Sequence, residues 1–166
     1  MARMLTDMPA GKPDAMRALS IRQPYAWAIA IGAKPVENRT WGTAYRGLIA
    51  IHASKTRPDR SDVENYLILD AVEACGFEID EAASGQGVIV AVAGLSGCHL
   101  SPDFGGTCGA TRPLCSPWAV RDQYHWLLEN VRPLAEPVPC RGALGLWRLP
   151  DDVEKAVRKQ MEGSDG

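Results

Sequence analysis

The part of the sequence that most restricts the fold is the run GVIVAVAGLSGCH at residues 87–99. It is rich in β-branched residues, and its apolar character is too continuous to leave one face polar. A strand of this kind belongs in the middle of a sheet rather than at its edge. The run therefore predicts a buried central strand in a sheet-based domain.

Shorter segments provide the other predicted elements. Pro24 suits the first turn of a helix, and Gly32 suits the position just after a helix end. Ser61 and Glu64 have the spacing of a capping box, which predicts a helix start. Several short strands interrupted by helices favour an α+β fold, a small mixed β-barrel flanked by helices, over a doubly wound parallel sheet. The further predicted strands cover 18–21, 47–53, 124–131 and 142–150, and the predicted helices cover 24–32, 61–74 and 152–161.

Length and composition favour one domain. The chain has 166 residues, of which 46% are hydrophobic and 23% charged, enough for a single core. We expect a disordered N-terminal tail at 1–16, one domain at 17–162 and a disordered end at 163–166. No stretch reaches the roughly 20 continuous apolar residues of a membrane span, and the N-terminus lacks a signal-peptide pattern. Five irregularly spaced cysteines fit a reducing compartment, so a cytoplasmic location is expected.

Charge is distributed unevenly along the chain, although the formal net charge is only -2. Residues 17–60 hold eight basic and two acidic residues, a sum of +6, whereas 61–82 hold seven acidic residues and no basic one. A basic region beside aromatic residues is typical of a protein that binds a polyanion. Charge blocks also occur on solvated surfaces for solubility alone. Charge by itself therefore leaves both interpretations open.

A motif lies within the basic region. The sequence SIRQPYAWAIAIGAKPVENRTW, followed by YRGLIAIHASK, contains the pattern Gly-x-Lys-x-x-Glu-x-Arg at residues 32–39, which we call the signature segment. With RQPYA before it and IHASK after it, this region closely resembles the activating-signal-cointegrator homology (ASCH) domain, a branch of the PUA-like superfamily. The resemblance is strong over 19–55 and continues more weakly to GALGLWRLP. It implies a closed or nearly closed β-barrel flanked by helices, a cleft beside the signature segment and RNA binding.

The signature residues admit structural and functional interpretations. Gly32 is explained as a helix-ending residue. We expect Lys34 to face the cleft, where its ammonium would meet a phosphate or a developing oxyanion. Glu37 and Arg39 alternate along an extended segment, which places them on one side and Asn38 on the other. They form a structural ion pair, or Glu37 acts as a general base or aligns Lys34 while Arg39 binds a phosphate or a base edge; the two interpretations are compatible.

Neighbouring residues complete the candidate site. Trp41 lies in a predicted loop, where its ring can stack on an unpaired base, whereas Trp27 in mid-helix is expected in the core. His52 is a secondary candidate for proton transfer. The candidate catalytic residues are Lys34, Glu37 and His52. The candidate ligand-binding residues are Gln23, Tyr25, Lys34, Arg39, Trp41, Ser54 and Lys55.

Metal binding is a separate question. Cys98, His99, Cys108 and Cys115 lie at or within the turn-rich segment 100–117 and offer four zinc ligands. Their spacing differs from that of paired Cys-x-x-Cys knuckles, so we expect buried or loop thiols rather than structural zinc, and predict no metal site. No cofactor is expected for binding, and a divalent metal is considered only for a nuclease.

Three functions remain open at this stage. The first is an RNA-binding module that holds single-stranded RNA or a nucleotide in a basic cleft, and that cleaves RNA if Lys34 and Glu37 or His52 are catalytic. The second is an amidohydrolase that acts on an acetylated cytidine, as some relatives do with a lysine, a threonine and a glutamate; Glu37 here replaces that threonine and leaves no hydroxyl nucleophile. The third is a coregulator-like interaction module that uses the acidic helix at 61–74. Enzymatic activity and a protein partner are left open, and no membrane partner is expected.

Overall fold

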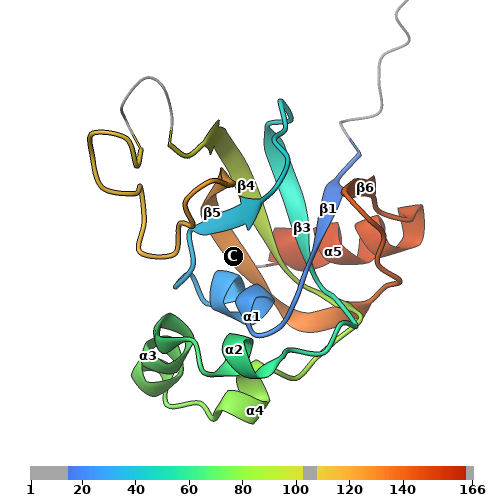
Figure 1. The fold of residues 1–166 in the computed structure, drawn as a ribbon. Coiled ribbons are helices and arrows are strands. Elements are labelled where there is room, and N and C mark those ends of the chain that lie inside the picture. The colour runs from blue at the N-terminus through green and yellow to red at the C-terminus, as the bar shows by residue number, and fades with distance from the viewer. Residues whose placement is uncertain (1–14, 103–107, 164–166) are drawn as a thin grey trace, which may run out of the picture.

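The computed structural model describes residues 15–102 and 108–163 (Figure 1). The described strands form one mixed sheet in the order β2-β5-β4-β3-β1-β6. Strands β1 and β3 pair in parallel, and the other neighbours pair antiparallel. The strands are β1 (Arg17–Ile21), β2 (Val36–Arg39), β3 (Gly47–Ala53), β4 (Val88–Leu100), β5 (Tyr124–Pro139) and β6 (Leu146–Arg148).

The predicted central strand is confirmed, because β4 lies between β3 and β5. Its pairing with β5 shifts register three times, between Ile89 and Ala91, between Val92 and Gly94, and between Leu95 and Gly97. Each shift bends the strand and increases its twist. The sheet is therefore curled into a half-barrel, with β2 and β6 at its edges (Figure 1). This confirms the predicted α+β, barrel-like fold.

Helices cover both faces of the curled sheet. Their bounds are α1 (Tyr25–Ala30), α2 (Arg60–Val63), α3 (Tyr66–Cys75), α4 (Ile79–Ala82) and α5 (Asp151–Gly163). Alternating strand residues form two cores. Leu19, Ile49 and Ile51 face the side on which α1 packs, together with the buried Trp126. Ala18, Ala50 and Val92 face the opposite side, where α5 packs.

The helix predicted at 61–74 is two helices. α2 ends at Val63, and the Asn65 side chain starts α3 by accepting hydrogen bonds from the backbone amides of Leu67 (3.0 Å) and Ile68 (3.4 Å). The predicted cap at Ser61 is wrong by two residues, because Asp59 caps α2 and exchanges hydrogen bonds with Asp62. Aspartate and asparagine are strong N-caps, so two such residues in close succession favour two helix starts.

Two strands and the N-terminal tail differ from their predicted bounds. β5 continues to Pro139, beyond the predicted 124–131, and the strand predicted at 142–150 is only Leu146–Arg148. Met16, expected at the end of the tail, is buried, and its amide donates to Glu154 Oε1 (3.2 Å). Residues 1–14 of the expected tail and residues 164–166 of the expected end lie outside the described residues. Among the helices that the structure describes, none has the length and apolar character to cross a membrane.

Candidate functional site

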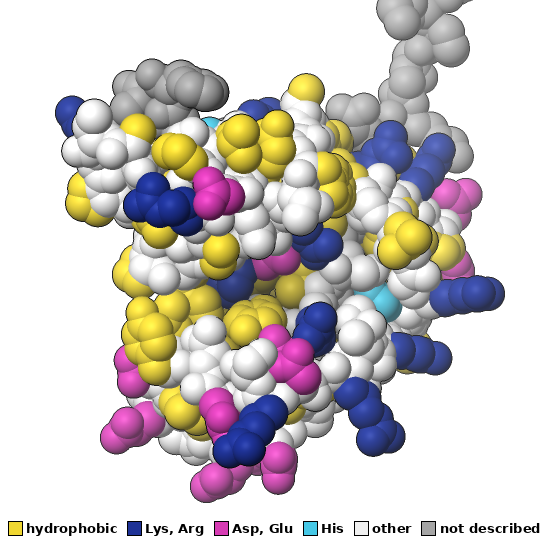
Figure 2. All heavy atoms as spheres, in the orientation of Figure 1, with side chains coloured by type: hydrophobic (Ala, Val, Ile, Leu, Met, Phe, Trp, Pro, Cys, Tyr) yellow, Lys and Arg dark blue, Asp and Glu magenta, His cyan; other side chains and the backbone are white. Residues whose placement is uncertain are grey.

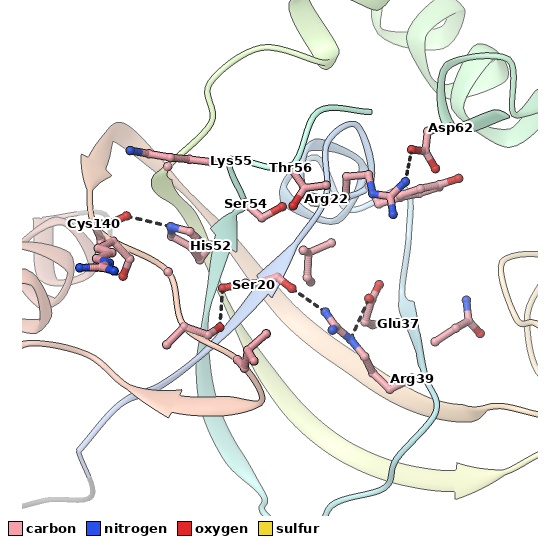
Figure 3. A pocket seen from close by; sticks show the side chains of 18 of the residues that line it. Ser20, Arg22, Glu37, Arg39, His52, Ser54, Lys55, Thr56, Asp62 and Cys140 are labelled. Carbon is pink, nitrogen blue, oxygen red and sulfur yellow. Dashed lines mark hydrogen bonds and ion pairs between the residues drawn. The ribbon is translucent and has the colours of Figure 1, made fainter. Parts of the chain in front are cut away.

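A cavity of about 1260 Å³ lies beside the signature strand β2. Figure 2 shows the molecule hollowed between the sheet and the helices α2 to α4, and Figure 3 shows the side chains of the cavity. The lining comes from the ends of β1 and β3, from β2, and from the segment that joins β5 to β6. Segments far apart in the sequence thus meet around one hollow.

Glu37 is the centre of the signature segment. Its Oε2 lies 2.6 Å from Lys34 Nζ, and its Oε1 lies 3.2 Å from Arg39 Nε. The Lys34 ammonium also donates to the Val36 carbonyl and lies 5.8 Å from the centre of the Tyr25 ring. Lys34 is only 3% exposed and does not line the cavity, whereas Glu37 does. The structure therefore places Lys34 behind Glu37, as its buried counter-ion.

Arg39 projects from β2 on the same side as Glu37, as the alternation predicts (Figure 3). Its Nη2 donates to the Ser20 carbonyl at the end of β1 (2.7 Å). Asn38 points the other way and holds the loop before β5, with hydrogen bonds to the Trp118 carbonyl and the Val120 amide (2.8 Å each). The two faces of this short strand thus serve different parts of the molecule.

His52 forms a second polar centre in the cavity wall. Its Nε2 lies 2.9 Å from the Cys140 carbonyl, which can only accept, so Nε2 carries the proton. The other nitrogen, Nδ1, is buried and has no hydrogen-bond partner among the described residues. Burial, with the nearby positive charge of Lys55, lowers the pKa of His52 below its ordinary value. A neutral imidazole therefore keeps an unused acceptor lone pair in the cavity wall.

Gly142 is packed against this imidazole. A Cβ atom there would lie 2.5 Å from His52 Cε1 and 2.9 Å from both His52 Nδ1 and Ser20 Oγ, closer than real contacts allow. The segment between β5 and β6 can therefore pass over His52 only because residue 142 has no side chain. Its backbone completes the wall of the cavity at this point.

The cations of the lining fall into two groups. Arg22 and Arg39 are held in ion pairs, Arg22 with Asp62 (2.8 Å) and Asp59 (3.3 Å). Hydrogen bonding and charge from Asp62 raise the pKa of Arg22, so that side chain stays charged. Lys55 and Arg141 have no ion pair within the part of the chain that the structure describes. These two cations are available for an anion.

The net charge of the lining is positive. Its cations are Arg22, Arg39, Lys55 and Arg141, and its carboxylates are Glu37 and Asp62. Both carboxylates are already paired with basic side chains. The excess of two positive charges is therefore not neutralised within the lining, despite the chain's overall charge of -2.

Not all predicted site residues lie at the cavity. Gln23 is buried, with its amide donating to the Ser84 carbonyl (2.7 Å) and its oxygen accepting from the Trp27 amide (2.9 Å). Trp41 packs edge-on against Trp126 at a centroid distance of 4.7 Å. Neither residue lines the cavity, nor does Lys34. The predicted residues that do line it are Tyr25, Glu37, Arg39, His52, Ser54 and Lys55.

Sequence reasoning missed Arg22 and Arg141. Arg22 lies in the RQPYA segment next to the predicted site residue Gln23, so its place in the sequence already indicated that it lies near the site. Arg141 follows β5, far from the signature segment, and only the curled sheet brings it to the same cavity. No local pattern in the sequence indicates that contact.

The structure is a small α+β domain with a curled mixed sheet and a cationic cavity beside a buried Lys-Glu-Arg cluster. The ASCH domain family model matches residues 19–138, and the chain belongs to this family.

Solved structures agree with this fold. The crystal structure of ASCH from Zymomonas mobilis matches with a TM-score of 0.50 and 15% sequence identity, over 87% of this chain and 94% of that chain. A tyrosine-to-phenylalanine mutant of the ASCH protein from the same organism matches with a TM-score of 0.50 and 16% identity, over 87% of this chain and 97% of that chain. No curated protein matches the chain. At these identities the likeness concerns the fold alone.

Proposed function

We propose that this protein binds single-stranded RNA, or a single nucleotide, in the cavity beside β2. The observation that carries the proposal is the presence on the lining of two cations, Lys55 and Arg141, that have no ion pair among the described residues. Phosphate groups of RNA are bound mainly by such basic side chains. The general link of the ASCH family to RNA binding supports the same choice.

The size and lining of the cavity suit a nucleotide. Ligand cavities for small molecules commonly measure about 300–1000 Å³, so about 1260 Å³ leaves room for one nucleotide and a neighbouring phosphate. The half-buried Tyr25 offers an aromatic surface, and Ser54 offers a hydroxyl. We assign Lys55 and Arg141 to phosphates, and Arg39 to the base or ribose.

The contacts favour binding over hydrolysis. A general base needs a carboxylate that can accept a proton, yet both oxygens of Glu37 are held by cations. Lys34 cannot readily stabilise a reacting phosphate or carbonyl, because its ammonium is enclosed behind Glu37. Glu37, a member of this ion pair, stands at the sequence position where the related amidohydrolases have a threonine hydroxyl. For these reasons we do not assign Lys34 and Glu37 a catalytic role.

The test is a titration of a labelled single-stranded oligoribonucleotide, followed by fluorescence anisotropy at several salt concentrations. Lys55→Met and Arg141→Met should each weaken binding and reduce the salt slope by about 0.7, the value for one phosphate contact on a single strand. Lys159→Met on α5, an exposed lysine that does not line the cavity, is the matched control and should behave as wild type.

Two results would contradict the proposal. If wild type fails to bind RNA and nucleoside monophosphates at low salt, the assignment of the cavity is wrong. Unchanged affinity and salt slope in both variants would move the binding site elsewhere. The RNA recovered after titration should be intact. If wild type cleaves the RNA and Glu37→Gln or His52→Gln does not, the protein is a nuclease rather than a binding module.

A further inference from the structure

Four metal-binding side chains converge at the outer end of β4 and β5, away from the cavity. His99 on β4 lies directly opposite His125 on β5 in the strand register. Cys108 and Cys115 come from the segment that joins the two strands. One ligand atom from each residue lies within 4.8 Å of every other ligand atom. We call these four residues the Cys2His2 cluster.

The distances in the Cys2His2 cluster fit a single tetrahedral ion. His125 Nδ1 lies 3.4 Å from Cys108 Sγ, 3.3 Å from Cys115 Sγ and 3.3 Å from His99 Nε2. With usual zinc bond lengths, a tetrahedron places two nitrogens about 3.4 Å apart and a nitrogen and a sulfur about 3.6 Å apart. The ligands of a two-iron cluster are divided between two metal atoms and would lie farther apart.

Surrounding hydrogen bonds hold the ligands in the required state. The Nε2 of His125 lies 2.6 Å from the Val120 carbonyl and therefore carries the proton, which leaves the Nδ1 lone pair directed at the cluster. The backbone amide of Cys115 donates to Cys108 Sγ (3.3 Å), a contact that suits a thiolate. His125 and Cys108 are buried, so the cluster is partly enclosed by protein.

We propose that the Cys2His2 cluster binds one zinc ion as a structural site. Two thiolates and two imidazoles are a donor set that zinc prefers, and four protein ligands leave no open position for substrate. The described part of the segment between β4 and β5 contains no helix or strand. A bound ion would join this segment to the sheet, in addition to the hydrogen bonds of Asn38 to Trp118 and Val120.

The proposed zinc site differs from the expectation, made from the sequence, of buried or loop thiols. Cys98, one of the four ligands considered from the sequence, packs against the main core, because it lies on the face of β4 opposite to His99. His125 takes its place from the neighbouring strand. Spacing along the chain alone does not indicate this contact, which arises from strand pairing.

The proposal is tested on the full chain with metal alone. Protein reconstituted with zinc and freed of excess metal should contain about one zinc per chain by elemental analysis. Cobalt(II) substitution should give the visible bands of a tetrahedral site together with thiolate charge-transfer absorption. Cys115→Ser and His99→Gln should each weaken zinc binding by at least about 100-fold, more than the loss of a residue that only hydrogen-bonds to a ligand.

Matched controls separate ligand loss from general damage. Cys98→Ser, next to His99 on β4, and Cys75→Ser, exposed at the end of α3, should keep one zinc per chain. If Cys115→Ser fails to fold, the partly exposed His99→Gln and the cobalt spectrum of wild type still decide. A wild-type protein that takes up far less than one zinc, or a cobalt spectrum without thiolate bands, would overturn the proposal. Equal zinc loss in Cys98→Ser would do the same.

Discussion

At the scale of single residues, the two lysines nearest the cavity have opposite roles. Lys34 is enclosed, paired with Glu37 and bonded to a backbone carbonyl. Lys55 is exposed on the lining with no ion pair among the described residues. Because Lys34 is buried and paired, its removal should lower the free energy of unfolding substantially. Lys55 is exposed and is therefore available to bind a ligand.

These roles predict that the same substitution affects stability at Lys34 and RNA binding at Lys55. Lys34→Met should lower the free energy of unfolding by about 3 kcal/mol, because Glu37 stays buried with Arg39 as its remaining partner. Lys55→Met should change it by less than about 0.5 kcal/mol while weakening RNA binding. Urea denaturation of both variants measures the difference. Equal midpoints for the two variants would show that Lys34 is not a buried structural cation.

His52 predicts a dependence of stability on pH. Its pKa in the folded protein lies below the ordinary value of 6.5, so its contribution to stability is present above pH 6.5 and is lost as pH falls through the folded pKa. Between about pH 7 and pH 5, wild type should therefore lose stability faster than His52→Gln, by at most about 1.4 kcal/mol per pH unit. Unfolding measured over this range tests the difference in slope. Parallel curves would contradict it.

At the scale of elements, β2 connects the cavity with the segment that carries two ligands of the Cys2His2 cluster. Glu37 and Arg39 face the first, and Asn38 holds the second through the Trp118 carbonyl and the Val120 amide. β2 also pairs with β5 in a register that sets Asn38 opposite His125. A short edge strand thus positions two separate groups of side chains.

This connection predicts a local effect of Asn38→Ala. The substitution removes two hydrogen bonds, which should cost about 1–2 kcal/mol and speed amide exchange at residues 116–121. Asn65→Ala is the matched control, because loss of the α3 cap should cost about 1 kcal/mol without loosening that segment. Hydrogen exchange followed by mass spectrometry distinguishes the two. If both variants protect 116–121 as wild type does, Asn38 does not hold the segment.

The sequence predicted the elements more fully than the site. β4 was predictable because its apolar run is continuous, and the same-side placement of Glu37 and Arg39 followed from strand alternation. The burial of Lys34 was not, because it depends on how Tyr25 and Glu37 come to lie around its ammonium in the folded chain. The pairing of His99 with His125 and the position of Arg141 at the cavity depend in the same way on strand pairing across long separations. Local patterns indicate elements, whereas sites arise where elements meet.

At the scale of the whole molecule, positive and negative charge are separated. The acidic block at 61–82 forms α2, α3 and α4, and acidic side chains gather below the hollow in Figure 2. Several basic side chains project along the right edge of the same view. Asp62 of α2 joins the two regions through its ion pair with Arg22. A polyanion is therefore attracted to one side of the cavity and repelled from the helices, which a net charge of -2 does not reveal.

The three register shifts between β4 and β5 also restrict how these strands can meet during folding. Two antiparallel strands with uniform pairing can slide by two residues and keep every side chain on its face. Here such a slip would place each irregular position of β4 opposite a part of β5 that is not shaped to pair with it. Hydrogen bonds between the strands would then be lost. The irregularities thus disfavour misaligned sheets. The alignment in which His99 faces His125 is selected by backbone geometry nearer the middle of the sheet.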